Sequence, residues 1–307
     1  MSDPQSLSLR LGIDWGGTKM EVIALDSASG AERFRKRVPT PRDDYAGCIA
    51  AVRDLVRAAE AETGLAGSVG LGIPGSLSPA TGLVKNANST WMNGKPLDRD
   101  LEEALARPVR IQNDANCLAV SEATDGAGAG AHVVHAIIIG TGCGSGIAID
   151  GRAHRGANGI GGEWGNIPVP WMREDEYPGP ECWTGHRGTI DRLCSGTGFQ
   201  WDFEQASGEA LTGREIVERA REGCPVAGGS LERYISRLGR AMAMAANLID
   251  PDVFVLGGGM SNVDELYTGL PDAMAPFIFS DHYEVPIRRA AHGDSSGVRG
   301  AAWLWNA

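Results

Sequence analysis

The same local pattern occurs twice in this chain of 307 residues: an apolar run, a glycine-rich turn and a second apolar run. The first copy is LRLGIDWGGTKMEVIAL, residues 9–25, and the second is HAIIIGTGCGSGIAIDG, residues 135–151. Two short runs of strand-forming residues joined by a tight glycine turn are typical of a β-hairpin. A repeat at this interval indicates two similar domains, which also suits a length above the usual size of a single core.

Periodicity outside the hairpins predicts the remaining main elements. Apolar residues at helical spacing predict helices over 44–63, from about Asp114 to 123, over 231–249 and over 297–305. Apolar runs predict strands over 68–73, 109–111 and 252–257. The segment 152–191 is rich in glycine, proline and tryptophan and lacks periodicity, which is typical of a long binding loop.

Composition excludes several classes of protein. The net charge is −11 and no Lys/Arg-rich run is present, which argues against a nucleic-acid or anionic-membrane partner. No signal peptide is evident, and no segment reaches the roughly 20 apolar residues that a membrane span needs. The six cysteines are scattered without tight spacing, so we expect a reduced, cytoplasmic protein.

Three glycine turns each follow an apolar strand: Gly16–Lys19, Gly140–Gly142 and Gly257–Gly259. Glycine lets the backbone approach a bulky anion and present successive N–H groups to it. Each turn alone could be a simple tight turn, but three at strand ends favour a site for a polyphosphate. Lys19 itself has the ordinary alternative of a solvated strand residue.

Two aspartates adjoin these strand ends. Asp114 follows a predicted strand at the edge where α/β sheets place their chemistry, so it could accept a proton from a substrate hydroxyl that attacks phosphorus. The alternative is that Asp114 is a helix N-cap. Asp14 could hold magnesium through water, or it could stabilise the turn beside it.

Taken together, these segments resemble the ROK family of sugar kinases. The matching stretches are IDWGGTK (13–19), GIPG (72–75), KNANSTW (85–91), QNDANC (112–117), IIIGTGCGSG (137–146), GEWG (162–165) and LIDPDVFVLGGGMSN (248–262). The likeness is strongest to bacterial fructokinases of the manno(fructo)kinase type. It implies a two-domain α/β fold of the actin/hexokinase-like (ribonuclease H-like) ATPases, with the active site in the interdomain cleft. The expected domains are 1–117 with 292–307, and 118–291.

The resemblance also implies an activity, ATP- and Mg²⁺-dependent phosphorylation of a hexose, with D-fructose and its 6-hydroxyl expected. Asp114 matches the catalytic base, and Asp14 would hold magnesium through water. The positions that match sugar contacts are Gly75, Asn88, Asn113, Glu163, Asn166 and Asp191. The positions that match ATP contacts are Gly16, Gly17, Thr18, Lys19, Thr141, Gly142, Gly258 and Gly259. A homodimer is the expected assembly.

The chain departs from the family at the residues that usually bind a structural zinc ion. Asn166 stands at the position of a histidine, and Thr184 and Thr189 stand at two cysteine positions, so that only Cys182 remains. Threonine and asparagine are poor zinc ligands, and His186 with Cys182 does not complete a site. We therefore predict that no zinc binds. Asp191 replaces a glutamate of the sugar pocket, and Asn166 a histidine, which could change the hexose that fits.

Alternatives to fructose phosphorylation remain open at this point. Mannose, glucose, allose or an N-acetylated amino sugar could be the substrate. The protein could also be a sugar-binding relative without catalysis, although Asp114 and both phosphate turns are retained. A sugar-responsive repressor of the family would carry an extra helix-turn-helix segment before the first strand. In this sequence the first strand is expected to begin within about ten residues of Met1, which argues against a repressor. Trp164, Trp171 and Trp183 are interpreted as packing residues of the long loop rather than as sugar-stacking residues.

Overall fold

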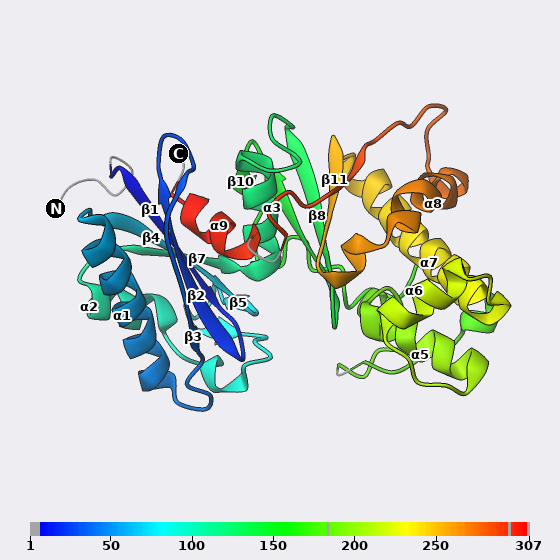
Figure 1. The fold of residues 1–307 in the computed structure, drawn as a ribbon, viewed down its shortest axis with the longest axis horizontal. Coiled ribbons are helices and arrows are strands. Elements are labelled where there is room, and N and C mark those ends of the chain that lie inside the picture. The colour runs from blue at the N-terminus through cyan, green and yellow to red at the C-terminus, as the bar shows by residue number, and fades with distance from the viewer. Residues whose placement is uncertain (1–6, 183, 294–295, 306–307) are drawn as a thin grey trace. The chain divides into compact units, whose positions relative to one another are not determined.

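The computed structural model describes residues 7–182, 184–293 and 296–305, and Figure 1 shows their fold. The chain divides into two compact units. The first consists of Met1–His132, Gly146–Gly162 and Ala291–Ala307, and the second of Val133–Ser145 and Glu163–Ala290. The sequence placed the first change of domain after residue 117, whereas here the following residues stay with the first unit. The reason is the packing of the helix that contains Cys117, described below.

The first unit contains a five-stranded sheet with the order β3-β2-β1-β4-β7. Its strands are β1 (Leu9–Trp15), β2 (Lys19–Asp26), β3 (Glu32–Pro39), β4 (Gly67–Ile73) and β7 (Val109–Asn113). β1 and β2 pair antiparallel around the turn 16–18, which confirms the first predicted hairpin. β4 pairs parallel with β1 and with β7, so these three strands end at the same edge of the sheet.

Helices cover both faces of this sheet. They are α1 (Tyr45–Thr63), α2 (Leu97–Leu105), α3 (Asp114–Thr124) and α9 (Ser296–Trp303). In Figure 1, α1 and α2 lie on one side of the sheet and α9 lies on the other. Short elements complete the unit: β5 (Ser76–Leu77), β6 (Val84–Lys85), η2 (Thr90–Met92) and β10 (Arg152–Ala153).

The backbone of helix α9 lies in direct contact with the backbone of α3 and β4, and glycine makes this close approach possible. A Cβ atom at Gly300 would overlap the carbonyl oxygen of Cys117 on α3. Likewise, a Cβ at Gly70 on β4 would overlap the Ala301 carbonyl oxygen of α9. These contacts fix α3 to α9 and the sheet, and they explain why α3 belongs to the first unit.

The second sheet has the order β10-β9-β8-β11-β12, and the change of unit falls within β9. Its other strands are β8 (Val133–Ile139), β9 (Cys143–Ile149), β11 (Val253–Gly257) and β12 (Ile287–Arg289). β8 and β9 are neighbours joined by the turn 140–142, as the second predicted hairpin requires. The second unit also contains η3 (Glu174–Glu176), α4 (Ile190–Leu193), α5 (Gly196–Ser207), α6 (Gly213–Arg221), α7 (Pro225–Ile249), η4 (Gly259–Asn262), α8 (Asp264–Met274) and η5 (Ala275–Phe277).

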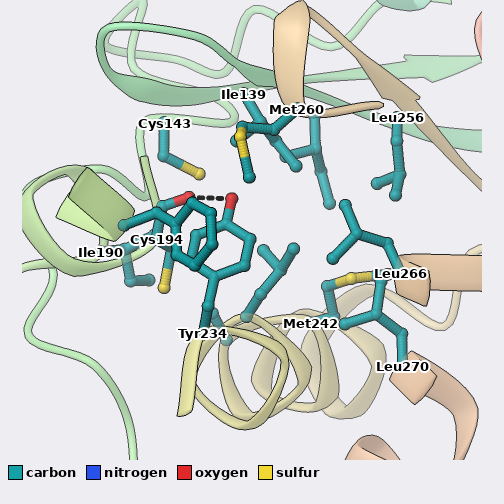
Figure 2. Packing of buried hydrophobic residues seen from close by; sticks show 14 of the residues in the cluster. Ile139, Cys143, Ile190, Cys194, Tyr234, Met242, Leu256, Met260, Leu266 and Leu270 are labelled. Atoms are coloured by element: carbon teal, nitrogen blue, oxygen red, sulfur yellow. Dashed lines mark hydrogen bonds between the residues drawn. The ribbon is translucent and has the colours of Figure 1, made fainter. Parts of the chain in front are cut away.

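The core of the second unit forms around α7. Figure 2 shows Tyr234 of α7 pointing toward Cys194, and its hydroxyl donates a hydrogen bond to the Cys194 carbonyl oxygen at 2.9 Å. Leu266 and Leu270 of α8 pack on the same helix near Met242. The predicted helix over 231–249 is therefore correct but starts earlier, at Pro225. Among the described residues, no helix is both long enough and apolar enough to cross a membrane.

Candidate active site

In the first unit, the parallel strands bring four predicted site residues to one edge. Asp14 on β1 pairs with Gly72 on β4, and Ile73 on β4 pairs with Asn113 on β7. Gly75 lies two residues after the end of β4, and Asp114 directly follows β7. The amide of Asn113 donates to the Gly75 carbonyl oxygen at 3.2 Å. The candidate base and two candidate sugar contacts thus belong to one connected group.

Asn113, rather than Asp114, is the N-cap of α3. Its side-chain oxygen accepts hydrogen bonds from the N–H groups of Ala115 (2.9 Å) and Asn116 (3.4 Å). This excludes the alternative that Asp114 serves as the cap. Asp114 is half-buried, and burial raises its pKa, although the Ala115 amide, which donates to its carboxylate at 2.8 Å, acts in the opposite direction. A carboxylate with a raised pKa is a better proton acceptor for an alcohol.

Asp14 is a second carboxylate at the strand edge whose pKa is raised. Burial and then the charge of Asp114 raise the pKa of Asp14 to about 7, and the charge of Glu21 adds to this. Glu21 lies opposite Asp14 in the β1–β2 ladder. A divalent cation would relieve the repulsion between these carboxylates. Their oxygen atoms therefore fit the magnesium ion that the fold family implies. The role of Asp14 remains a prediction.

The first glycine turn offers two backbone amides. Gly16 uses its N–H to close the turn on the Lys19 carbonyl oxygen at 3.0 Å. The N–H groups of Gly17 and Thr18 have no hydrogen-bond partner within the part of the chain that the structure describes. Thr40, which follows β3, holds the turn, since its hydroxyl donates to the Gly16 carbonyl oxygen at 2.7 Å. Exposed backbone donors at a turn suit a phosphate group.

Ser89, the neighbour of the predicted sugar contact Asn88, lies close to this turn. Ser89 is buried, and its Oγ atom would lie 3.3 Å from a Cβ at Gly17. Asn88 itself is exposed, as a ligand contact can be. The sequence did not single out Ser89 or Thr40. Ser89 lies against the turn and Thr40 hydrogen-bonds to it, each from a distant segment, so local pattern gave no signal for them.

The second unit places its two predicted ATP segments side by side. β8 and β11 are parallel neighbours, and Ile138 pairs with Gly257 at the end where the turns 140–142 and 258–259 begin. Gly258 has a φ of +81°, and a Cβ there would strike the backbone of Ile139. Glycine is therefore required at Gly258 by both conformation and space.

The turn 140–142 is also held by the start of α5. The Thr197 hydroxyl donates to the Thr141 carbonyl oxygen at 2.7 Å, and the Gly196 N–H donates to the Gly140 carbonyl oxygen at 2.8 Å. In the described chain, the N–H groups of Thr141 and Gly142 have no hydrogen-bond partner. Two amides beside a helix N-terminus favour an anion. A Ser-x-x-Gly start of α5 (195–198) was a local signal that sequence reasoning missed.

Asp191 connects this turn to the long loop. Its Oδ1 atom accepts a hydrogen bond from the Cys143 N–H at 2.9 Å. The Asp191 N–H donates to the Gly165 carbonyl oxygen at 2.9 Å. Gly165 lies between the predicted sugar contacts Glu163 and Asn166, which are both exposed. Within the second unit, the candidate phosphate and sugar residues are therefore linked through Asp191.

Comparison with known proteins identifies the family of this chain. The sequence model of the ROK family matches residues 10–307. The chain belongs to the ROK family. The ROK hexokinase of Thermus thermophilus superposes with a TM-score of 0.85 and 31% identity over 97% of each chain. The fold of this ROK protein is thus the expected actin/hexokinase-like ATPase fold.

Several relatives of this ROK protein are named as sugar kinases. It is 41% identical over 297 residues to the N-acetyl-D-glucosamine kinase of Pectobacterium atrosepticum, covering 95% of this chain and 97% of that protein. It is 37% identical over 299 residues to the corresponding kinase of Haemophilus influenzae, covering 96% and 98%. A glucokinase of Streptomyces griseus, solved with glucose and AMPPNP, matches with a TM-score of 0.76 and 27% identity over 96% and 98% of the chains.

The positions of this ROK protein that match zinc ligands come together, but they are joined by hydrogen bonds. The Cys182 sulfur lies 2.9 Å from the Thr184 hydroxyl, which donates to the Asn166 side-chain oxygen at 3.3 Å. Thr189 is fully buried. Among the described residues, no group of three or more His, Cys, Asp or Glu side chains could hold a metal. The absence of zinc remains a prediction that rests on ligand chemistry.

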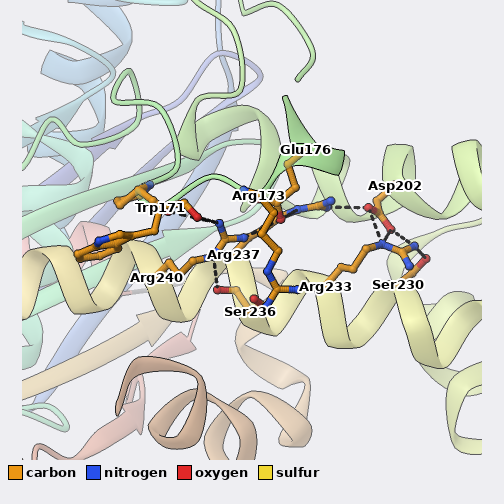
Figure 3. A network of polar contacts seen from close by, with 10 residues as sticks. Trp171, Arg173, Glu176, Asp202, Ser230, Arg233, Ser236, Arg237 and Arg240 are labelled. Atoms are coloured by element: carbon orange, nitrogen blue, oxygen red, sulfur yellow. Dashed lines mark hydrogen bonds and ion pairs between the residues drawn. The ribbon is translucent and has the colours of Figure 1, made fainter. Parts of the chain in front are cut away.

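A buried charge network holds the long loop on α7 (Figure 3). Glu176 accepts hydrogen bonds from Arg237 (3.0 Å) and Arg240 (2.6 Å), and Arg237 also pairs with Asp202 at 2.6 Å. Arg240 has no exposed side-chain surface and donates to the Trp171 carbonyl oxygen at 2.7 Å. The network therefore fixes the loop between Asn166 and Cys182.

The tryptophans of the loop behave as packing residues where they are described. Trp164 is buried, and its Nε1 donates to the Cys143 carbonyl oxygen at 3.2 Å. Trp171 is partly exposed, with its ring centroid 4.9 Å from that of Phe277. Trp183 lies outside the described residues.

Proposed function

We propose that this ROK protein is an ATP-dependent hexose kinase and that N-acetyl-D-glucosamine is its preferred substrate. The kinase proposal rests on the position and the surroundings of Asp114. Its pKa is raised by burial, it lies at the start of α3, and Asn113 performs the capping that would otherwise occupy it. A carboxylate in this position suits general base catalysis of phosphoryl transfer to an alcohol.

The proposed reaction transfers the γ-phosphoryl group of ATP to a sugar hydroxyl. Asp114 accepts the hydroxyl proton as the oxygen attacks the γ-phosphorus atom, and ADP leaves. The N–H groups of Gly17, Thr18, Thr141 and Gly142 bind phosphate oxygens, which orients the nucleotide and stabilises charge. Magnesium, when bound with ATP, would neutralise phosphate charge, and Asp14 would hold it through water.

The choice of sugar rests on two observations. The relatives with the higher identities reported above are named as N-acetyl-D-glucosamine kinases. In addition, Asp191 is one methylene shorter than the glutamate expected at its position, and its carboxylate is directed to the Cys143 amide. Both features favour a sugar pocket that accepts a substituent larger than a hydroxyl group.

Fructose, the substrate expected from the sequence, has less support. None of the four relatives reported above is named for fructose. Fructose therefore enters the test as a competing substrate.

A coupled assay of ADP release over a hexose panel tests the proposal. The panel contains N-acetyl-D-glucosamine, N-acetyl-D-mannosamine, glucose, mannose and fructose, and Asp114→Asn is the control. We expect the highest kcat/KM for N-acetyl-D-glucosamine and a loss of kcat of about 10²–10⁴-fold in the control. Light scattering of the same preparation tests the predicted homodimer.

Two results would contradict different parts of the proposal. A higher kcat/KM for another sugar would refute the substrate and leave the kinase. Turnover no greater than that of Asp114→Asn on every sugar would refute the kinase.

A further inference from the structure

An open groove of about 580 Å³ lies in the first unit, and none of the candidate site residues lines it. β7 forms one wall, and as the last strand in its sheet order it has one edge without a neighbouring strand. The residues that matter for the argument are Arg110, Gln112, Arg152, Arg155, Trp303 and Leu304. The volume is that of a pocket for a small organic molecule.

The arginines of this groove are unlike most others in the described chain. Arginines elsewhere commonly pair with a carboxylate, as Arg107 does with Glu60 and Arg299 with Asp125. Arg110, Arg152 and Arg155 have no carboxylate within ion-pair distance in the described chain. Three unpaired guanidinium groups therefore line one cavity of a chain whose net charge is −11.

The structure positions two of these side chains while leaving donors available. Arg110 donates to the Leu304 carbonyl oxygen at 2.6 Å, and its guanidinium stacks 4.3 Å from the ring of Trp305. Arg155 donates to the Leu77 carbonyl oxygen at 3.2 Å. A guanidinium has five N–H donors, so one such bond each leaves several for a ligand.

Acceptors complete the lining. Asp98 and Glu102, from the first turns of α2, also face the groove. Glu102 accepts a hydrogen bond from the Val109 N–H at 3.2 Å. A ligand that suits this lining therefore carries an anionic group for the arginines and hydroxyl groups for the carboxylates.

We propose that the groove binds a phosphorylated sugar, with its phosphate on Arg152 and Arg155 and its hydroxyl groups toward Asp98. Planar guanidinium groups match phosphate oxygens in a bidentate manner. The proposal does not depend on the proposed function, because no groove residue is assigned to the reaction. Gln112 lines the groove and precedes Asn113 and Asp114, so a bound ligand contacts the strand that positions the candidate base.

Isothermal titration calorimetry with D-glucose 6-phosphate tests the site. N-acetyl-D-glucosamine and AMPPNP are present at saturation to fill the candidate active site, so that the titration measures binding outside that site. We expect saturable binding with a Kd of about 1 mM or tighter, and quenching of tryptophan fluorescence from Trp303. Arg152→Ala with Arg155→Ala should weaken binding at least tenfold, since each removes charged hydrogen bonds.

The controls separate the groove from general charge effects. Arg214→Ala with Arg219→Ala removes two arginines from α6 in the second unit and should leave the affinity unchanged. The Arg152 side chain is exposed and makes no hydrogen bond or ion pair in the described chain. The single substitution Arg152→Glu should therefore also abolish binding. No saturable binding, equal binding to the Arg152/Arg155 variant, or equal affinity for inorganic phosphate would each overturn the proposal.

Discussion

The Asp191 carboxylate accepts a hydrogen bond from the backbone N–H of Cys143 at 2.9 Å. This contact joins the end of the long loop to the turn that carries Thr141 and Gly142. A Cβ at Gly142 would lie 2.5 Å from the same Asp191 oxygen, so the two segments fit closely. Asp191, itself a predicted sugar contact, therefore also supports the turn that carries the predicted phosphate contacts.

Replacement of Asp191 should affect both substrates of the proposed reaction. In Asp191→Ala, the Cys143 amide loses its charged acceptor, and we expect the KM for ATP and the KM for the sugar each to rise about tenfold or more. Asp191→Asn keeps an acceptor oxygen and should recover most of the ATP effect. Steady-state kinetics with each substrate varied measures both values, and an unchanged KM for ATP in Asp191→Ala would contradict the supporting role.

His135 should make stability depend on pH. It is buried between Trp164 and Phe254, with ring centroids at 5.3 and 5.4 Å, and burial lowers its pKa from 6.5 to about 4. Neither ring nitrogen has a hydrogen-bond partner in the described chain. At pH values between the two pKa values, His135 binds a proton in the unfolded state but not in the folded state. The free energy of unfolding should therefore fall by about 3 kcal/mol as the pH drops from about 6.5 to about 4.

The variant His135→Phe tests this effect because it keeps an aromatic ring and removes the titration. Urea unfolding at about pH 7 and about pH 5 gives the change for each protein. Carboxylates such as Glu176 also lose stability in acid, but they do so equally in both proteins. The same pH dependence in the variant and the parent would show that His135 is not responsible.

Glu176 should be essential for the stability of the second unit. In Glu176→Gln the buried Arg237 and Arg240 lose their shared carboxylate, and we expect a loss of about 3–5 kcal/mol in the free energy of unfolding. The control is Glu218→Gln, which breaks an exposed pair with Arg214 and should change little. Urea unfolding measures both, and an equal small effect would refute a structural role for the network.

Gly300 should tolerate no side chain. Gly300→Ala puts a methyl group against the Cys117 carbonyl oxygen, and we expect a loss of about 3 kcal/mol or more, or failure to fold. Gly297 lies in the same helix, and a Cβ there would meet nothing within 4 Å. Gly297→Ala should therefore be neutral or slightly stabilising. Thermal unfolding compares the two, and equal melting temperatures would contradict the close packing of α9.

Zinc should be absent from the purified protein. Thr184, Thr189 and Asn166 offer poor zinc ligands, so elemental analysis without chelator should find far less than one zinc ion per chain. EDTA should leave the melting temperature unchanged. Near one zinc per chain, released by replacement of Cys182, would show that the ligand argument is wrong.

Local sequence determined the two hairpins, the helix after Asp114 and the glycine at Gly258. Each depends on residues that are neighbours in the chain, where spacing and backbone preference act directly. The strand pattern also placed Asp14 near the end of β1 and Asp114 directly after β7. The motifs were also sufficient to indicate the ROK family, which the comparison with known proteins confirmed.

Only the tertiary structure decided how the long loop is held and which residues support the turns. Arg237 and Arg240 reach Glu176 from a helix more than sixty positions further along the chain, and no pattern near Glu176 indicates this pairing. Similarly, Asp191 accepts a hydrogen bond from the Cys143 amide, 48 positions away in the chain. Such contacts depend on the packing of whole elements, because hydrogen bonds between distant residues form only where buried surfaces have already brought them together.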